Sequence, residues 1–234
     1  MNRFVFSLIT LVLIFFTHHF STYLHEWSHG LAAWCFGYKQ NPFDISYGTD
    51  WIWLSDISEN VDYLQMGALE KSVVAIVPTL VGALLFLVSL RALSLSKCRW
   101  QYSFWYWFAL MNLGQVWDYV PIRTFSAEGD IANFLQASQL SPWAVLVPGS
   151  LFTLGGMYLF LWRISPKAFK VMQIHRSWSQ QVMFFIILII FFGYFGGVGF
   201  TQTDEVSHHL SLVSWLMIPF GFVLIRLFKR LSRA

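Results

Sequence analysis

Long apolar runs constrain this chain more than any other feature. They cover residues 4–36, 72–90, 101–117, 143–162, 181–200 and 211–228. Most approach the roughly 20 residues that cross a bilayer, and the first is long enough to tilt or to project beyond the hydrocarbon. The 234 residues are only 12% charged, against about 25% in soluble domains. We therefore expect an all-α, polytopic membrane helix bundle of about six transmembrane helices. We expect it to form one domain over residues 1–234, with no nucleic-acid partner.

Charged residues between the runs sort by sign. Basic side chains gather at 91–99, at 163–176 and after 226, whereas acidic ones gather at 44–62 and 204–205. The positive-inside rule then places both termini in the cytoplasm. We expect an integral, multi-pass protein surrounded by the lipid bilayer of a bacterial cell (inner) membrane.

The same rule places residues 118–141 on the outer side. This stretch holds Pro121 and Pro142, with a short helix predicted to open near 126–130. Non-helical backbone at membrane depth must be buried in protein or line a wet cavity. We therefore expect a re-entrant or short helical segment around 118–141.

A polar motif ends the first apolar run. The stretch "YLHEWSHGLAAW" reads H-E-x-x-H, with His25, Glu26 and His29. Residues i and i+4 share one helix face, so the two imidazoles can converge on a zinc ion. Glu26 is then placed to act as general base on a bound water. In a soluble helix such a pattern is often only a solvated face. Within a membrane, unpartnered polar groups are costly, which favours the metal site.

A catalytic zinc needs a third protein ligand. The candidates on the predicted outer side are Asp118, Glu128, Asp130, His208 and His209. We favour Asp130, because Gly129 gives the backbone freedom for a sharp entry and Asp130 begins the following helix. Glu128 is the alternative third ligand, and either acid can instead cap the helix N-terminus.

Three further regions carry polar residues without an assigned role. His18 and His19 precede the motif on the same helix, where they can line a water path or hydrogen-bond within the bundle. His208 and His209 are expected to lie in a short outer loop, in contact with solvent. The loop 37–69 contains "ISYGTDWIWLSDI", which indicates a short hairpin or a membrane-surface segment.

The motif "HEWSHGLAAW" resembles the first motif of the site-2 protease family of intramembrane zinc metalloproteases, in which an alanine follows HExxH by four residues. Here that alanine is Ala33, and Gly30, Ala32 and Ala33 form a small-residue surface where helices can approach closely. The family's second motif has a proline-containing run and then an aspartate beside a glycine. "YVPIRTFSAEGDI" is similar in order, with A-E-G-D where the family has L-D-G. The resemblance covers residues 20–34 and 116–134.

This resemblance implies a zinc metalloendopeptidase that hydrolyses a peptide bond in or near a membrane-embedded segment of a protein or peptide substrate. His25, His29 and Asp130 would hold zinc, and Glu26 would activate the water. The alternative is a catalytically silent membrane binding or chaperone relative that retains the fold. A metal transporter would need polar groups across the whole membrane, and a diiron enzyme would need more histidines than the seven present. The sequence does not indicate an oligomeric state.

Overall fold

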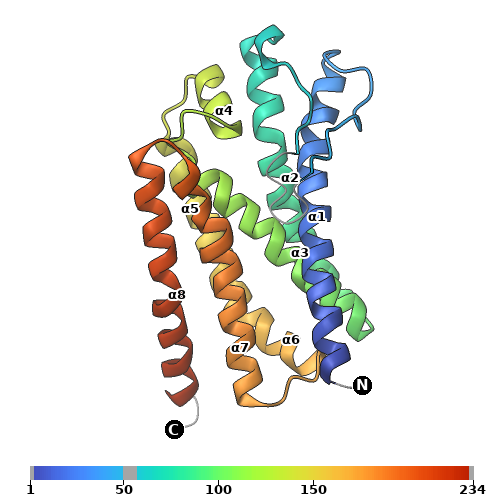
Figure 1. The fold of residues 1–234 in the computed structure, drawn as a ribbon, viewed down its shortest axis with the longest axis vertical. Coiled ribbons are helices and arrows are strands. Elements are labelled where there is room, and N and C mark those ends of the chain that lie inside the picture. Colours follow the sequence, from blue (N-terminus) through green and yellow to red (C-terminus); the bar gives the residue numbers. More distant parts are fainter. Residues whose placement is uncertain (1–2, 50–56, 232–234) are drawn as a thin grey trace. The chain divides into compact units, whose positions relative to one another are not determined.

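The computed structural model describes residues 3–49 and 57–231. The chain is helical and has no strand in these ranges (Figure 1), which confirms the all-α prediction. It divides into two compact units. Unit 1 comprises Met1–Asn112 and Glu128–Ala144, and unit 2 comprises Leu113–Ala127 and Val145–Ala234. The expectation of a single domain stays a prediction.

Five helices of the described ranges are long and apolar enough to cross a membrane. They are Ser7–Cys35, Ala68–Leu95, Trp143–Val171, Ser177–Thr201 and Glu205–Arg226. The prediction of a multi-pass membrane protein is confirmed at this level. The apolar run at 101–117 forms α3 (Arg99–Trp117), which is not among the five. Polar side chains such as Asn112 and Gln115 lower its hydropathy, although both are buried.

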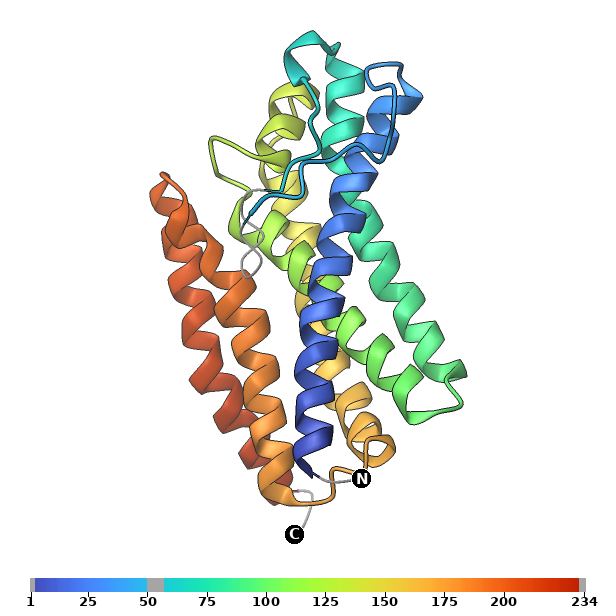
Figure 2. The same ribbon diagram turned by 45° about the vertical axis from the view of Figure 1, so that its right-hand side comes forward.

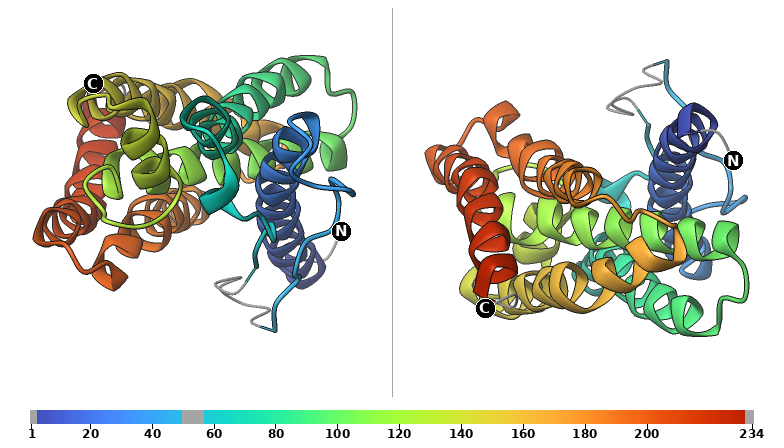
Figure 3. Two further views of the ribbon diagram at one scale, coloured as in Figure 1. Left: turned by 90° about the horizontal axis from the view of Figure 1, so that it is seen from above. Right: turned by 90° about the horizontal axis from the view of Figure 1, so that it is seen from below.

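Unit 1 places three helix ends together. α1 (Arg3–Cys35) is an unbroken helix of 33 residues, about 50 Å long at 1.5 Å per residue. It packs against α2 (Ala68–Leu95), which packs in turn against α4 (Asp130–Ser138). The C-terminal end of α1, the start of α2 and α4 lie at the same end of the unit (Figure 1). Seen from above, α2 lies beside both α1 and α4 (Figure 3).

Aromatic contacts hold α1 against α3 within unit 1. The rings of Phe20 and Phe108 lie 5.5 Å apart, and those of Phe16 and Phe104 lie 6.3 Å apart. Phe108 and its neighbour Trp107 are fully buried. Such pairs add to the burial of large apolar surfaces. They hold α1 in place about one and a half to two and a half turns before the H-E-x-x-H motif.

The connection between α1 and α2 folds back on itself. Ser46 and Ser58 form an antiparallel bridge, with N···O distances of 2.8 and 3.1 Å. Figure 2 shows the two described stretches running side by side. The bridge agrees with the predicted hairpin, whose middle, residues 50–56, lies outside the described residues. The turn η1 (Tyr63–Gln65) leads into α2, and the Asp62 carboxylate caps it by accepting the Leu64 N–H at 3.0 Å.

Unit 2 contains the remaining helices. In chain order they are η2 (Asp118–Ile122), α5 (Trp143–Leu159), η3 (Phe160–Ile164), α6 (Ser165–Val171), α7 (Ser177–Leu188), η4 (Ile189–Tyr194), η5 (Phe195–Thr201) and α8 (Glu205–Leu231). The Trp117 indole donates to the Ser214 hydroxyl at 3.1 Å, and that hydroxyl donates to the Phe192 carbonyl at 2.9 Å. This buried relay fastens α8 to η4.

Candidate metal centre

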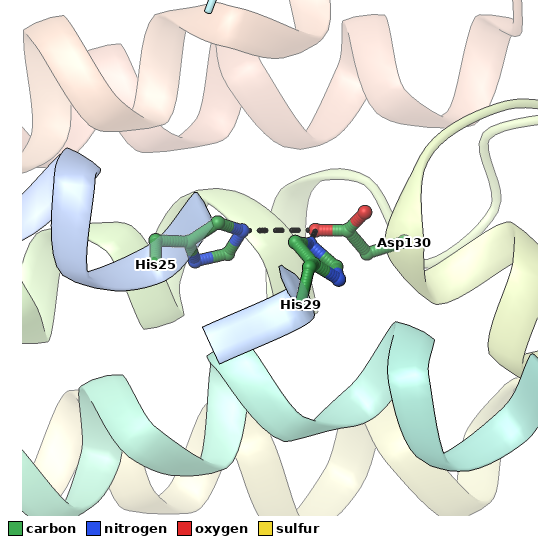
Figure 4. A group of neighbouring side chains, drawn as sticks. All are labelled: His25, His29 and Asp130. Carbon is green, nitrogen blue, oxygen red and sulfur yellow. Dashed lines mark hydrogen bonds and ion pairs between the residues drawn. The ribbon is translucent and has the colours of Figure 1, made fainter. Parts of the chain in front are cut away.

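Two histidines of α1 and one aspartate of α4 meet in unit 1. The Nε2 atoms of His25 and His29 lie 3.0 and 3.2 Å from the same oxygen, Oδ2 of Asp130. Both imidazoles point toward that carboxylate (Figure 4). The helix places His25 and His29 one turn apart, with ring centroids 5.1 Å from each other. The structure thus brings together the three residues that the sequence singled out as ligands.

Asp130 reaches the histidines because the chain turns sharply before α4. Gly129 has φ 99°, a conformation that glycine adopts far more readily than other residues. Asp130 is the first residue of α4, as the sequence predicted. Burial opposes ionisation of its carboxyl, but His29 and His25 more than offset this and hold the pKa of Asp130 below its ordinary value. The carboxylate is the form of this side chain that binds metal.

The orientation of the His29 ring is set by groups on its other side. Nδ1 lies 2.8 Å from the Val74 carbonyl oxygen of α2 and 3.0 Å from the Tyr63 hydroxyl. Because a carbonyl only accepts, Nδ1 carries the proton and donates it. Nε2, the ring atom that faces Asp130, would bind a metal ion through its lone pair. A hydrogen bond from the ring nitrogen that does not face the metal commonly orients a metal-binding histidine.

Glu26 lies beside the group and is 8% exposed. It interacts electrostatically with His29, Glu59 and Asp130. Glu59 also hydrogen-bonds the Tyr63 hydroxyl. Burial, and then the nearby Glu59 carboxylate, raise the pKa of Tyr63, so the phenol keeps its proton. Glu59 and Tyr63 were not predicted from the sequence, because loop 37–69 carries no motif that links these two residues to H-E-x-x-H.

The other candidate ligands have different surroundings. Glu128, the alternative third ligand, is exposed, and it is Asp130 that completes the group. Asp118, in unit 2, forms an ion pair with Arg123 through contacts of 2.9 and 3.0 Å. His208, also in unit 2, is exposed, and its Nε2 lies 2.7 Å from the Gln202 carbonyl oxygen. The exposed His209 is likewise outside the group.

His19 follows one of the two roles left open for the histidines before the motif. Its Nδ1 lies 3.0 Å from the Phe15 carbonyl oxygen one turn earlier, and its ring lies tilted against that of Phe15, with the centroids 3.9 Å apart. The contact is a hydrogen bond within the helix. The alternative, a water path along His18 and His19, stays a prediction.

The donor set of the group fits a metal ion. Its two imidazole nitrogens and one carboxylate oxygen all lie within 4.8 Å of one another. Three protein ligands of these types are the set that catalytic zinc takes, leaving a fourth position open. Within the described ranges, His25, His29 and Asp130 are the residues that could hold such an ion.

No family model matches the chain, and no curated protein or solved structure matches it either. The function therefore has to be argued from the site itself.

Proposed function

We propose that this protein is an intramembrane zinc-dependent endopeptidase, which hydrolyses a peptide bond in or near a membrane-embedded segment of a protein substrate. One observation carries the proposal: two buried imidazoles of a candidate membrane span converge with Asp130 on one point, beside the carboxyl of Glu26. Buried ionisable side chains on such a helix support the hypothesis of a functional site. The resemblance of its motifs to those of the site-2 protease family supports the same reaction.

Each residue has a chemical role in this proposal. His25, His29 and Asp130 would hold the zinc ion, which when bound polarises a water molecule and lowers its pKa toward about 7. Glu26 accepts the proton of that water and later returns it to the leaving amine. His25, Glu26 and His29 are buried, which keeps bulk water away from them and strengthens the electrostatic interactions inside the site.

The proposal includes a topology. We place both termini in the cytoplasm of a bacterial cell and the metal group in the outer part of the first span. The sign of the loop charges supports this orientation through the positive-inside rule. With the run at 101–117 counted as a span, the protein crosses the membrane about six times. Reporter fusions at the C-terminus and within loop 172–176 test it, because both are expected on the cytoplasmic side.

Metal content is the first test. The full chain, purified in mild detergent, is expected to carry near-stoichiometric zinc by mass spectrometry. His25→Ala should lose it, whereas Glu26→Gln should keep it, because Glu26 is not among the ligands. A wild-type protein that takes up no zinc when supplied with it would overturn the proposal.

Activity is the second test. Wild type and Glu26→Gln are reconstituted separately in liposomes with membrane proteins of a deletion strain, and new peptide N-termini are mapped. We expect N-termini that form with wild type and not with Glu26→Gln. Zinc binding without any such difference would indicate the catalytically silent relative instead.

A further inference from the structure

The loop between α1 and α2 brings two polar side chains to the metal group. Tyr63 places its hydroxyl 3.0 Å from Nδ1 of His29, and Glu59 hydrogen-bonds that hydroxyl and interacts electrostatically with Glu26. Glu59 and Tyr63 lie 30 or more residues beyond the motif in the chain. The stretch that they delimit is the 59–63 segment.

The hydrogen bonds of this segment run in one consistent direction. The Nδ1–H of His29 donates to the Val74 carbonyl and toward the Tyr63 oxygen. The Tyr63 O–H is then free to donate to the Glu59 carboxylate. Each bond polarises the next, so a carboxylate at the end of the chain makes the Tyr63 oxygen a better acceptor for His29.

The 59–63 segment is held in this place by several independent contacts. The Lys39 ammonium donates to the backbone carbonyls of Asp44 and Glu59 and so joins the two stretches of the loop. The bridge between Ser46 and Ser58 ends immediately before Glu59. These contacts place the segment through backbone atoms, and its arrival at His29 does not depend on the Tyr63 hydroxyl alone.

Gly30 lets the same loop approach α1 directly after His29. A Cβ at position 30 would overlap the carbonyl oxygen of Pro42. The small residue at this position was expected to serve helix packing, but its nearest neighbours are the loop residues Pro42 and Lys39. The helix surface beside the metal group is therefore shaped to receive the loop.

We propose that Tyr63 is a positioning residue for the metal ligand His29, and that Glu59 acts through Tyr63 by fixing its hydroxyl. The loop between α1 and α2 then contributes to the metal site, so the docking of this loop on α1 and the binding of zinc are coupled. This inference rests on the proposed zinc site, but it concerns how tightly zinc is held and not whether peptides are cleaved.

The experiment measures the zinc dissociation constant of the full-length protein in detergent, by competition with a chelator of known affinity. Tyr63→Phe removes only the hydroxyl. We expect its Kd to rise about tenfold, the lower end of the 10–100-fold effect of losing an outer-shell partner, because the bond to Val74 remains. Tyr47→Phe is the matched control, since Tyr47 lies in the same loop, is exposed, and contacts the ring of Tyr23. Its Kd should equal that of wild type.

Variants of Glu59 separate a positioning role from a charge effect. Glu59→Ala should weaken zinc binding several-fold, and it should add nothing in the Tyr63→Phe background because both changes break one chain of bonds. Glu59→Gln keeps an oxygen that accepts the Tyr63 O–H and should restore most of the affinity. If Glu59→Gln binds zinc as weakly as Glu59→Ala does, the negative charge of Glu59 accounts for the effect on zinc affinity and the positioning role is wrong.

The outcomes distinguish this inference from the proposed function. Wild type that binds zinc while Tyr63→Phe keeps the wild-type Kd overturns the role of Tyr63 and leaves the zinc site standing. Wild type that binds no zinc overturns both.

Discussion

Oδ2 of Asp130 lies 3.0 Å from Nε2 of His25, a residue 105 positions earlier in the chain. The two belong to different helices, α4 and α1, and α2 packs against both. The Asp130 side chain is 15% exposed, and a largely buried carboxylate is stable only when it is paired, because charges are costly to bury. Together with the two imidazoles, a bound cation would provide that pairing.

The first prediction separates the two acids that flank Gly129. Asp130→Ala should abolish stoichiometric zinc binding, because it removes the carboxylate that meets both histidines. Glu128→Ala should retain zinc, since Glu128 is exposed. Mass spectrometry of the two purified variants gives the answer. Zinc lost from Glu128→Ala and kept in Asp130→Ala would reverse the assignment of the third ligand.

A second prediction concerns the backbone at Gly129. Gly129→Ala puts a side chain at φ 99°, which costs about 1–2 kcal/mol and moves the start of α4. We expect weaker zinc binding and a lower midpoint of thermal unfolding in detergent. Gly37→Ala is the control, because Gly37 also has a positive φ, of 82°, and no atom crowds its Cβ position. It should lower stability but not zinc affinity. Equal zinc loss in both variants would show that general destabilisation is the cause.

The third prediction tests the docking of the loop on α1. Gly30→Ala should displace Pro42 and, through the loop, the Tyr63 hydroxyl, so that the zinc dissociation constant rises several-fold. Gly155→Ala makes the same change in helix α5, where no atom lies within 4 Å of the added Cβ. It should leave zinc binding unchanged. A wild-type Kd in Gly30→Ala would mean that the loop can shift without disturbing His29.

A fourth prediction concerns the ion pair of unit 2. Asp118→Ala leaves Arg123 without the carboxylate that it contacts at 2.9 and 3.0 Å. Breaking a largely buried pair destabilises a protein by up to about 3–5 kcal/mol, and the partial exposure of both side chains places this pair at or below the lower end. We expect a lower thermal midpoint with zinc content unchanged. Loss of zinc at an unchanged midpoint would instead make Asp118 a candidate ligand.

Local patterns predicted the parts of the site that depend on neighbours in sequence. His25 and His29 share a face because four residues make about one helical turn. The pair Gly129–Asp130 predicted a sharp turn into a helix, and the φ of 99° at Gly129 confirms that turn. The sequence did not separate Asp130 from Glu128 as the third ligand, because both acids suit the same local pattern. Which of the two acids faces α1 depends on how α4 packs against α2.

The loop contribution could not be predicted in this way. Glu59 and Tyr63 lie in a segment with no helical or strand periodicity, and their partners Glu26 and His29 are more than thirty residues away.

The number of spans also differs from the prediction. The run at 101–117 is apolar enough to be read as a span, yet α3 carries buried Asn112 and Gln115 and is not among the five candidate spans.

By itself the sequence determined that the chain is helical and membrane-spanning, and that two histidines and a glutamate share one helix, because hydropathy and helical periodicity are properties of neighbouring residues. Only the tertiary structure decided that Asp130 contacts those histidines, that Tyr63 contacts His29 and that Glu59 contacts Tyr63. Contacts between distant segments depend on how helices and loops pack, and no local pattern encodes that packing.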